Sequence, residues 1–216
     1  MSETVELIQS PLIPSFIRQS IYAGTGIVAG SSAIACDAAW SKLYSPKKFN
    51  IGAFLRANCA TQVGRAAVRF WTFDQVRRNL QGNAYMPIWV IGGTSGAIAG
   101  FTEVLAENLW QRTKPNPIIL AKTFSAFFAG FGTFTYLSRT LSEEMPPRPF
   151  WYCWLMGTCA GLSATAVLAT IDRIRPMQLI KSGILPKNML VIGTAISVQV
   201  TGCAEVEKIA KGYGLL

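Results

Sequence analysis

Six long apolar segments, separated by short polar stretches, dominate the hydrophobic pattern of this chain. Each is long enough to cross the hydrocarbon core of a membrane, which takes roughly 20 helical residues. They cover residues 16–43, 52–78, 87–112, 117–140, 150–176 and 186–210. The stretches between them combine prolines or glycines with charged or polar residues, and such residues end helices. The pattern predicts an all-α transmembrane protein with six membrane helices in a single membrane domain, residues 1–216.

The composition and the placement of charge agree with a membrane protein. Half of the 216 residues are hydrophobic and 14% are charged, against roughly 25% charged residues in soluble domains. The 20 Lys and Arg residues outnumber the 11 Asp and Glu residues. They gather at the ends of the apolar segments, which favours membrane anchoring over a nucleic-acid-binding face. We therefore expect no nucleic-acid partner.

The second apolar segment is the least hydrophobic, because it contains Arg56, Arg65 and Arg69. We still interpret it as a membrane helix, since arginines can face a protein interior or extend toward the interface. The Lys and Arg residues are biased toward one side, nine against seven, and both termini fall on the less basic side. The first ten residues lack a basic region and an apolar core, so we expect targeting information inside the chain.

The residue types argue against enzyme chemistry. The chain has no histidine, and its five cysteines form no Cys-x-x-Cys pair, so His-dependent catalysis is excluded and metal ligation is disfavoured. No Gly-rich phosphate loop and no nucleophile–base arrangement is present. We predict a protein that is not an enzyme and has no cofactor, although bound phospholipid such as cardiolipin is expected.

A repeat runs through the six segments. Small-residue patches begin at Gly24, Gly92 and Gly157 in the first, third and fifth segments, and each is followed thirteen residues later by a polar helix end. Such patches let helix backbones approach closely in lipid. The second, fourth and sixth segments also end alike, with polar motifs of similar spacing. We infer three degenerate two-helix repeats, covering residues 16–80, 87–141 and 150–211.

These motifs resemble those of the mitochondrial carrier family. Its odd helices end in Pro-x-[Asp/Glu]-x-x-[Lys/Arg] and its even helices in [Phe/Tyr]-[Asp/Glu]-x-x-[Arg/Lys]. Phe73, Asp74 and Arg77 match the second motif fully. Residues 64–70 are similar to the second helix of tricarboxylate (citrate) carriers, and residues 157–178 to a fifth carrier helix whose proline is replaced. The resemblance covers nearly the whole chain. It implies a carrier-like bundle in the mitochondrial inner membrane, with both termini on the intermembrane-space side.

The resemblance also implies three groups of site residues, each of them incomplete. The matrix-side ion-pair motifs retain Lys42, Glu107, Asp172 and Arg175. The opposite-side motifs retain Asp74, Arg77, Glu205 and Lys208. The anion-binding positions of the even helices keep Arg65 and Arg69 in the first repeat only, because the corresponding residues of the other repeats are Gly132, Phe128, Val200 and Ile196. The connections also leave little room for the short matrix helix of each carrier repeat.

Two interpretations remain open for each charged group. Arg65 and Arg69 are a remnant substrate site, or they pair with an acid such as Glu103, bind a lipid phosphate, or extend to the interface. Glu103 is a functional carboxylate, or the structural partner of Lys122 or Arg65. Asp37, Glu107 and Asp172 belong to a gate, or to a fixed set of ion pairs with Lys42 and Arg175.

Two functions follow from these alternatives. The first is a non-transporting, structural accessory subunit of a large inner-membrane complex, either of the respiratory chain or ATP synthase, whose partners are other membrane subunits and phospholipids. The second is a minimal carrier that exchanges an anionic metabolite such as a di- or tricarboxylate. A relative of Tim17-type import channels, which have four membrane spans, is a weaker third possibility.

Overall fold

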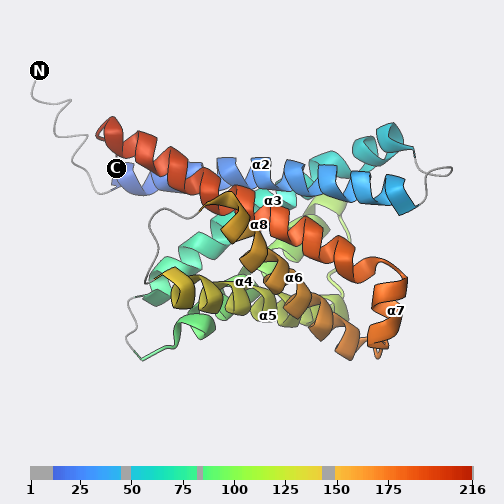
Figure 1. Cartoon of the computed structure of the whole chain (residues 1–216). Coiled ribbons are helices and arrows are strands. Elements are labelled where there is room, and N and C mark those ends of the chain that lie inside the picture. Colours follow the sequence, from blue (N-terminus) through green and yellow to red (C-terminus); the bar gives the residue numbers. More distant parts are fainter. Residues whose placement is uncertain (1–11, 45–49, 82–84, 143–148, 216) are drawn as a thin grey trace, which may run out of the picture.

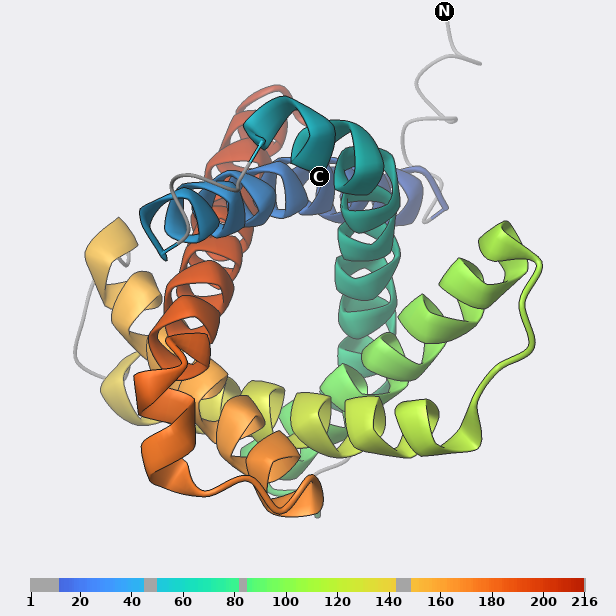
Figure 2. The ribbon, with the colours of Figure 1, turned by 90° about the vertical axis from the view of Figure 1, so that its right-hand side faces the viewer.

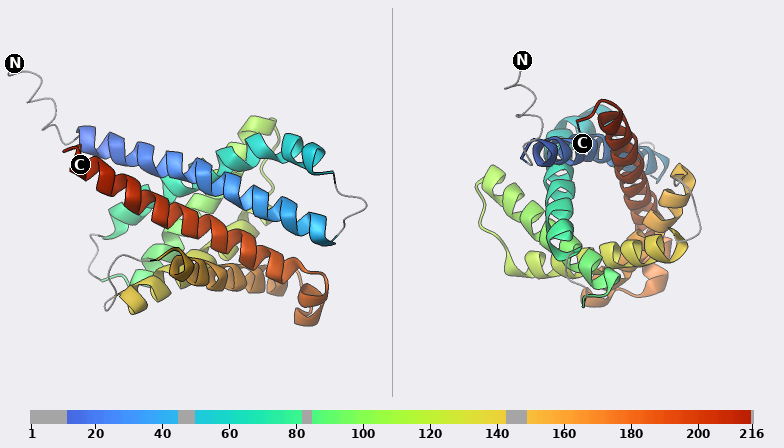
Figure 3. Two further views of the ribbon diagram at one scale, coloured as in Figure 1. Left: turned by 45° about the horizontal axis from the view of Figure 1, so that its top comes forward. Right: turned by 90° about the vertical axis from the view of Figure 1, so that its left-hand side faces the viewer.

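Six long helices form a closed ring in the computed structural model, which describes residues 12–44, 50–81, 85–142 and 149–215 (Figure 1). The helices are α2 (Leu12–Tyr44), α3 (Ile51–Gln81), α4 (Ile88–Gln111), α5 (Pro117–Ser142), α6 (Phe150–Ile171), the short α7 (Pro176–Lys181) and α8 (Ile184–Gly212). Each long helix packs against the next along the chain, and α8 returns to α2. Figure 2 and the right-hand view of Figure 3 look along the axis of this ring.

The prediction of six membrane helices is wrong. Four described helices are long and apolar enough to cross a membrane, namely α4, α5, α6 and α8. The other two long helices are too polar. α3 carries Arg56, Arg65, Arg69 and Asp74, and glycines, serines and Asp37 lower the mean hydropathy of α2. The four apolar helices indicate a membrane protein, and α2 and α3 complete the ring beside them.

The third connection contains a short helix where the sequence suggested an extended fifth segment to residue 176. α6 ends at Ile171, and Arg173 adopts a left-handed φ of 56°. Pro176 then stands at the first position of α7, where its missing N–H is harmless. Gly183, with a φ of 70°, turns the chain into α8. This turn places α7 at one end of the ring, and both described termini lie toward the other end (Figure 1).

Glycines set the close approach of the two helices within each repeat. Gly92, Gly96 and Gly100 of α4 recur every four residues and face α5. A Cβ atom added to Gly96 would lie 2.4 Å from Cβ of Phe131, which leaves no room for any side chain there. In the third repeat, a Cβ on Gly157 would lie 2.9 Å from Cα of Gly193. The small-residue patches therefore act as packing surfaces within the repeats.

Candidate functional site

Arg65 and Arg69 lie on one face of α3 and converge on a single carboxylate of α4. Glu103 has no exposed surface. Its Oε1 accepts a hydrogen bond from Nε of Arg65 at 2.6 Å. Nε of Arg69 donates to Oε2 at 2.5 Å, and Nη2 of Arg69 donates to Oε1 at 2.8 Å. The two arginines that the family resemblance assigns to a substrate site are thus joined to an acid of the neighbouring helix.

A second carboxylate completes the charge balance of this cluster. Glu107 stands one turn after Glu103 on α4, and its Oε2 lies 2.9 Å from Nη1 of Arg65. Two guanidinium groups therefore face two carboxylates between α3 and α4. Burying a lone carboxylate in an apolar helix is strongly unfavourable, whereas a paired and hydrogen-bonded one is tolerated. The interpretation of Glu103 as a partner of Arg65 agrees with this geometry, and Arg69 is its second partner.

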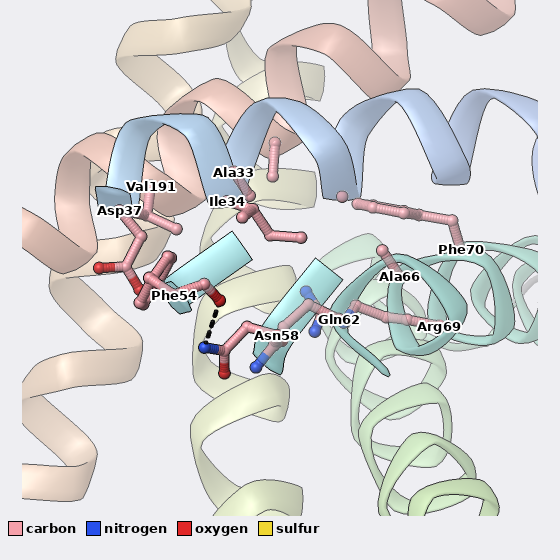
Figure 4. Close-up of a pocket in the computed structure, with 12 residues that line it drawn as sticks. Ala33, Ile34, Asp37, Phe54, Asn58, Gln62, Ala66, Arg69, Phe70 and Val191 are labelled. Carbon is pink, nitrogen blue, oxygen red and sulfur yellow. Dashed lines mark hydrogen bonds between the residues drawn. The ribbon is translucent and has the colours of Figure 1, made fainter. Parts of the chain in front are cut away.

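Arg69 also borders a cavity of about 160 Å³ inside the ring, between α2, α3 and α8 (Figure 4). Asp37, Asn58 and Gln62 supply the other polar side chains of its lining. The amide of Asn58 donates to the backbone oxygen of Phe54 at 2.9 Å. The guanidinium of Arg69 also makes a cation–π contact with Phe127, at 5.0 Å from the ring centroid. Arg69 therefore reaches the cavity as an already paired cation.

An aromatic layer divides the interior of the ring. A second cavity of about 240 Å³ adjoins the first and is almost entirely apolar. A third cavity, of about 230 Å³, opens toward the end that carries the termini. Phe70, Phe131 and Ile196 line both of these cavities and so form the wall between them. Ring contacts support the wall, with centroids 6.4 Å apart for Phe70 and Phe131 and 4.5 Å apart for Phe73 and Phe131.

Three ion pairs join neighbouring repeats at the end of the ring that carries α7. Oδ1 of Asp37 on α2 lies 2.8 Å from Nζ of Lys187 on α8. Glu107 on α4 pairs with Arg65 on α3. Asp172, which follows α6, pairs with Lys122 on α5. In each case the acid belongs to an odd helix of the repeat pattern, and the base lies on the adjacent even helix of the preceding repeat.

The partners of these acids differ from the expected ones. Asp37, Glu107 and Asp172 form ion pairs with Lys187, Arg65 and Lys122, respectively. Lys42 lies in the last turn of α2, and Arg175 is the exposed residue just before α7, with no ion pair among the described residues. The structure pairs Glu107 with Arg65 and Asp172 with Lys122, and these two pairs share no residue. Each pair joins segments that are neighbours around the ring.

At the opposite end, Asp74 is 1% exposed and is held by two arginines of its own helix. Arg77 lies 3.2 Å from its Oδ1, and Nε of Arg78 donates to its Oδ2 at 2.6 Å. Asp74 and Arg77 therefore pair within one helix. Glu205 and Lys208 are exposed and make no ion pair within the part of the chain that the structure describes.

The family pattern implied an ion pair for Glu205, but in the structure Glu207 makes the ion pairs at this end of α8. Its Oε1 lies 3.9 Å from Arg78 of α3 and 4.0 Å from Arg18 of α2, so it links α8 to both of these helices. Sequence reasoning missed Arg78 and Glu207. The spacing of Asp74 and Arg78, four residues apart on a helix, was the available signal for the first. No comparable signal identified Glu207.

Burial and charge shift two ionisation equilibria in this cluster. Burial disfavours the charge of the Arg78 guanidinium, but its hydrogen bond and charge interaction with Asp74 outweigh this and raise its pKa above the ordinary value. Burial, with a further contribution from the Asp74 charge, raises the pKa of Tyr22 to about 12. The guanidinium of Arg78 lies 5.6 Å from the ring centroid of Tyr22. Arg78 therefore stays charged and bound at this end of the ring.

Among the described residues, no three His, Cys, Asp or Glu side chains are grouped so that they could hold a metal ion. No protein-family model, no curated protein and no solved structure matches this chain. A proposal on function therefore depends on the contacts within the chain itself.

Proposed function

We propose that this protein is a non-transporting, structural subunit of a membrane-protein assembly. We further propose that it descends from the mitochondrial carrier family and resides in the mitochondrial inner membrane, with both termini on the intermembrane-space side. A respiratory-chain complex or ATP synthase is the proposed host. One observation carries the proposal: Arg65 and Arg69, the two cations at the family's anion-binding positions, are neutralised by Glu103 and Glu107.

The energetics of this cluster oppose the binding of an anionic substrate. A di- or tricarboxylate would gain about 1.5–3 kcal/mol for each charge-assisted hydrogen bond. The Nε atoms of Arg65 and Arg69 already donate to Glu103. Releasing them would leave a fully buried carboxylate without a partner, which costs about 3–5 kcal/mol. The cost cancels the gain from one or two new bonds, so the site does not attract a free anion.

The remaining contacts also favour a fixed ring over one that opens and closes. Alternating access requires two states in which contacts across the ring break and reform. Here the pairs Asp37–Lys187, Arg65–Glu107 and Lys122–Asp172 join adjacent helices along the wall. The layer around Phe70 and Phe131 fills the path between the cavities. These features support a scaffold whose helices keep their neighbours.

Two measurements on the full-length protein test the proposal. After extraction in mild detergent, the protein should migrate with an assembly much larger than the 23.5 kDa chain. Reconstituted in liposomes, the purified protein should exchange no labelled citrate, malate or phosphate. Exchange by the wild type that disappears in Arg69→Ala, and persists in the control Arg112→Ala at the exposed end of α4, would contradict the proposal. It would support the alternative of a minimal carrier for an anionic metabolite.

A further inference from the structure

The third cavity, at the end of the ring that carries the termini, borders two buried polar atoms that have no partner. In the described part of the chain, three buried side-chain nitrogen or oxygen atoms lack a hydrogen bond. Two of them, Oε1 of Gln199 on α8 and Nε of Arg77 on α3, belong to residues that line this cavity. A buried polar group without a partner is unfavourable, and native structures keep few of them. One acceptor and one donor at the same cavity indicate a place where a polar ligand group binds.

The side chain of Gln199 is held so that its amide nitrogen faces α2. Gln199 is 4% exposed, and its Nε2 donates to Oγ1 of Thr25 at 3.0 Å. The same hydroxyl donates to the backbone oxygen of Ile21 at 2.8 Å, so it accepts from Gln199, and this identifies the nitrogen end of the amide. Oε1 lies on the other branch of the planar amide and points away from Thr25. The unpartnered oxygen is therefore a fixed acceptor at the cavity.

The other polar groups of the lining already have partners within the chain. The hydroxyls of Thr135 and Ser138 donate to backbone oxygens of their own helix, at 2.7 and 3.1 Å. Nη2 of Arg77 pairs with Asp74, and Glu207 pairs with arginines of α2 and α3. One positive and one negative side chain line the cavity, and each has its own counter-charge. The lining therefore favours an uncharged ligand.

Apolar side chains form the rest of the cavity. Phe73, Phe134 and Val200 line its side, and the aromatic layer closes its inner end. A single water needs roughly 10–15 Å³ and two to four polar partners, whereas the cavity has about 230 Å³. Several waters in this space would lie against phenyl rings without partners. A ligand that is polar at one point and apolar over the rest of its surface fits the lining better.

We propose that the third cavity binds an uncharged molecule that carries a hydroxyl group on an apolar body. The hydroxyl donates to Oε1 of Gln199 and accepts from Nε of Arg77, while the body packs against Phe73, Phe134 and Val200. Aliphatic alcohols, such as a monoacylglycerol, and aromatic alcohols share this chemistry. Neither polar group lies at an anion-binding position that the family resemblance implies. The inference goes beyond the proposed role as a subunit and does not depend on it, because the site lies within one chain.

Photolabelling of the purified full-length protein tests the site. The probe is a photoreactive diazirine analogue of octanol, and the competitors are octanol, phenol, octane and octanoate at matched concentrations. We expect label on the peptides that contain Phe73, Phe134 or Val200. An alcohol should displace the probe, whereas octane lacks the hydroxyl and octanoate carries a charge, so neither should. The stronger competitor of octanol and phenol shows whether the site prefers an aliphatic or an aromatic body.

Two variants examine the polar and the apolar part of the site separately. Gln199→Met removes the acceptor at similar volume and should weaken displacement by octanol about fivefold, the effect of one lost hydrogen bond. Val200→Phe narrows the cavity while Gln199 stays in place, and it should reduce the labelling. Val206→Phe is the matched control, because Val206 is 39% exposed on the same helix and does not line the cavity. Unfolding temperatures close to that of the wild type exclude misfolding of Val200→Phe as the cause.

Three results would overturn the inference. Octane may not displace the probe as well as octanol does, since this would show a site for any apolar molecule. Equal labelling of Val200→Phe and Val206→Phe would place the probe outside the cavity. Labelling that no alcohol displaces would show that ordered water alone satisfies Gln199 and Arg77. The role as a subunit is tested separately by migration after mild detergent extraction, so it can hold or fail independently of this site.

Discussion

Arg69 and Glu103 form a two-point contact across the interface of α3 and α4, with Nε–Oε2 and Nη2–Oε1 distances of 2.5 and 2.8 Å. Bidentate pairs of this kind are the strongest charge-assisted hydrogen bonds in proteins. Arg65 adds a third bond to the same carboxylate. The pair therefore fixes the two helices relative to each other, and it removes the positive charge that an anion transporter would need.

Glu103→Gln should lower the free energy of unfolding by about 3–5 kcal/mol, because the largely buried guanidinium of Arg69 loses its counter-charge and Arg65 keeps only Glu107. Thermal unfolding in detergent, followed by circular dichroism, measures the change. Glu107→Gln is the control, since Glu107 is partly exposed and holds one ion pair, and its loss should be clearly smaller. The double variant Arg69→Met/Glu103→Leu should lose less stability than the sum of its single variants. Additive losses would indicate that the contact couples the helices weakly.

Gly96→Ala should destabilise the protein by about 1–3 kcal/mol, the usual cost of overpacking. The new Cβ atom would lie 2.4 Å from Cβ of Phe131 and force α4 and α5 apart. Unfolding temperature is again the readout. Gly24→Ala is the matched substitution at an open position, where the gain in helix propensity should leave stability unchanged or raise it by up to about 1 kcal/mol. Equal effects of the two substitutions would show that Gly96 is not a packing position.

Asp37→Asn should cost at most about 1 kcal/mol in the detergent-solubilised protein, because the Asp37–Lys187 pair is partly exposed. The effect should shrink between low and high salt, since added ions screen such pairs. Melting curves at the two salt concentrations measure it. The charge-swapped variant Asp37→Lys/Lys187→Asp should recover most of the loss. If the swap behaves worse than either single change, the pair is not the main interaction of these side chains.

Glu207→Ala should lower the unfolding temperature of the purified protein, whereas Glu205→Ala should not. Glu207 faces Arg18 and Arg78, so its removal loosens the contact of α8 with α2 and α3 by about 0.5–1 kcal/mol. Glu205 is exposed and has no ion pair among the described residues. The two substitutions remove the same side chain two residues apart, so each controls for the other. A larger effect at Glu205 would restore the expectation drawn from the family motif.

Local patterns in the sequence were sufficient to predict where most of the long helices lie. The apolar segments predicted the six long helices with ends close to those observed, because proline, glycine and charge act on the chain locally. The small-residue patches at Gly92 and Gly157 indicated packing surfaces, and both lie against the second helix of their repeat. Segment length alone, however, predicted six membrane helices, which is too many. Because α3 carries charges and α2 carries small polar residues, four of the described helices are apolar enough to cross a membrane.

The sequence by itself determined that Glu103 lies inside an apolar helix, which left it either a functional carboxylate or the structural partner of Lys122 or Arg65. Only the tertiary structure decided that its partners are Arg65 and Arg69, which lie 38 and 34 residues away in the chain. The same holds for Asp37 and Lys187, which meet only when α8 closes the ring against α2. Charge–charge contacts between helices depend on their rotation and offset. Those are set by packing across the whole ring, which no local pattern encodes.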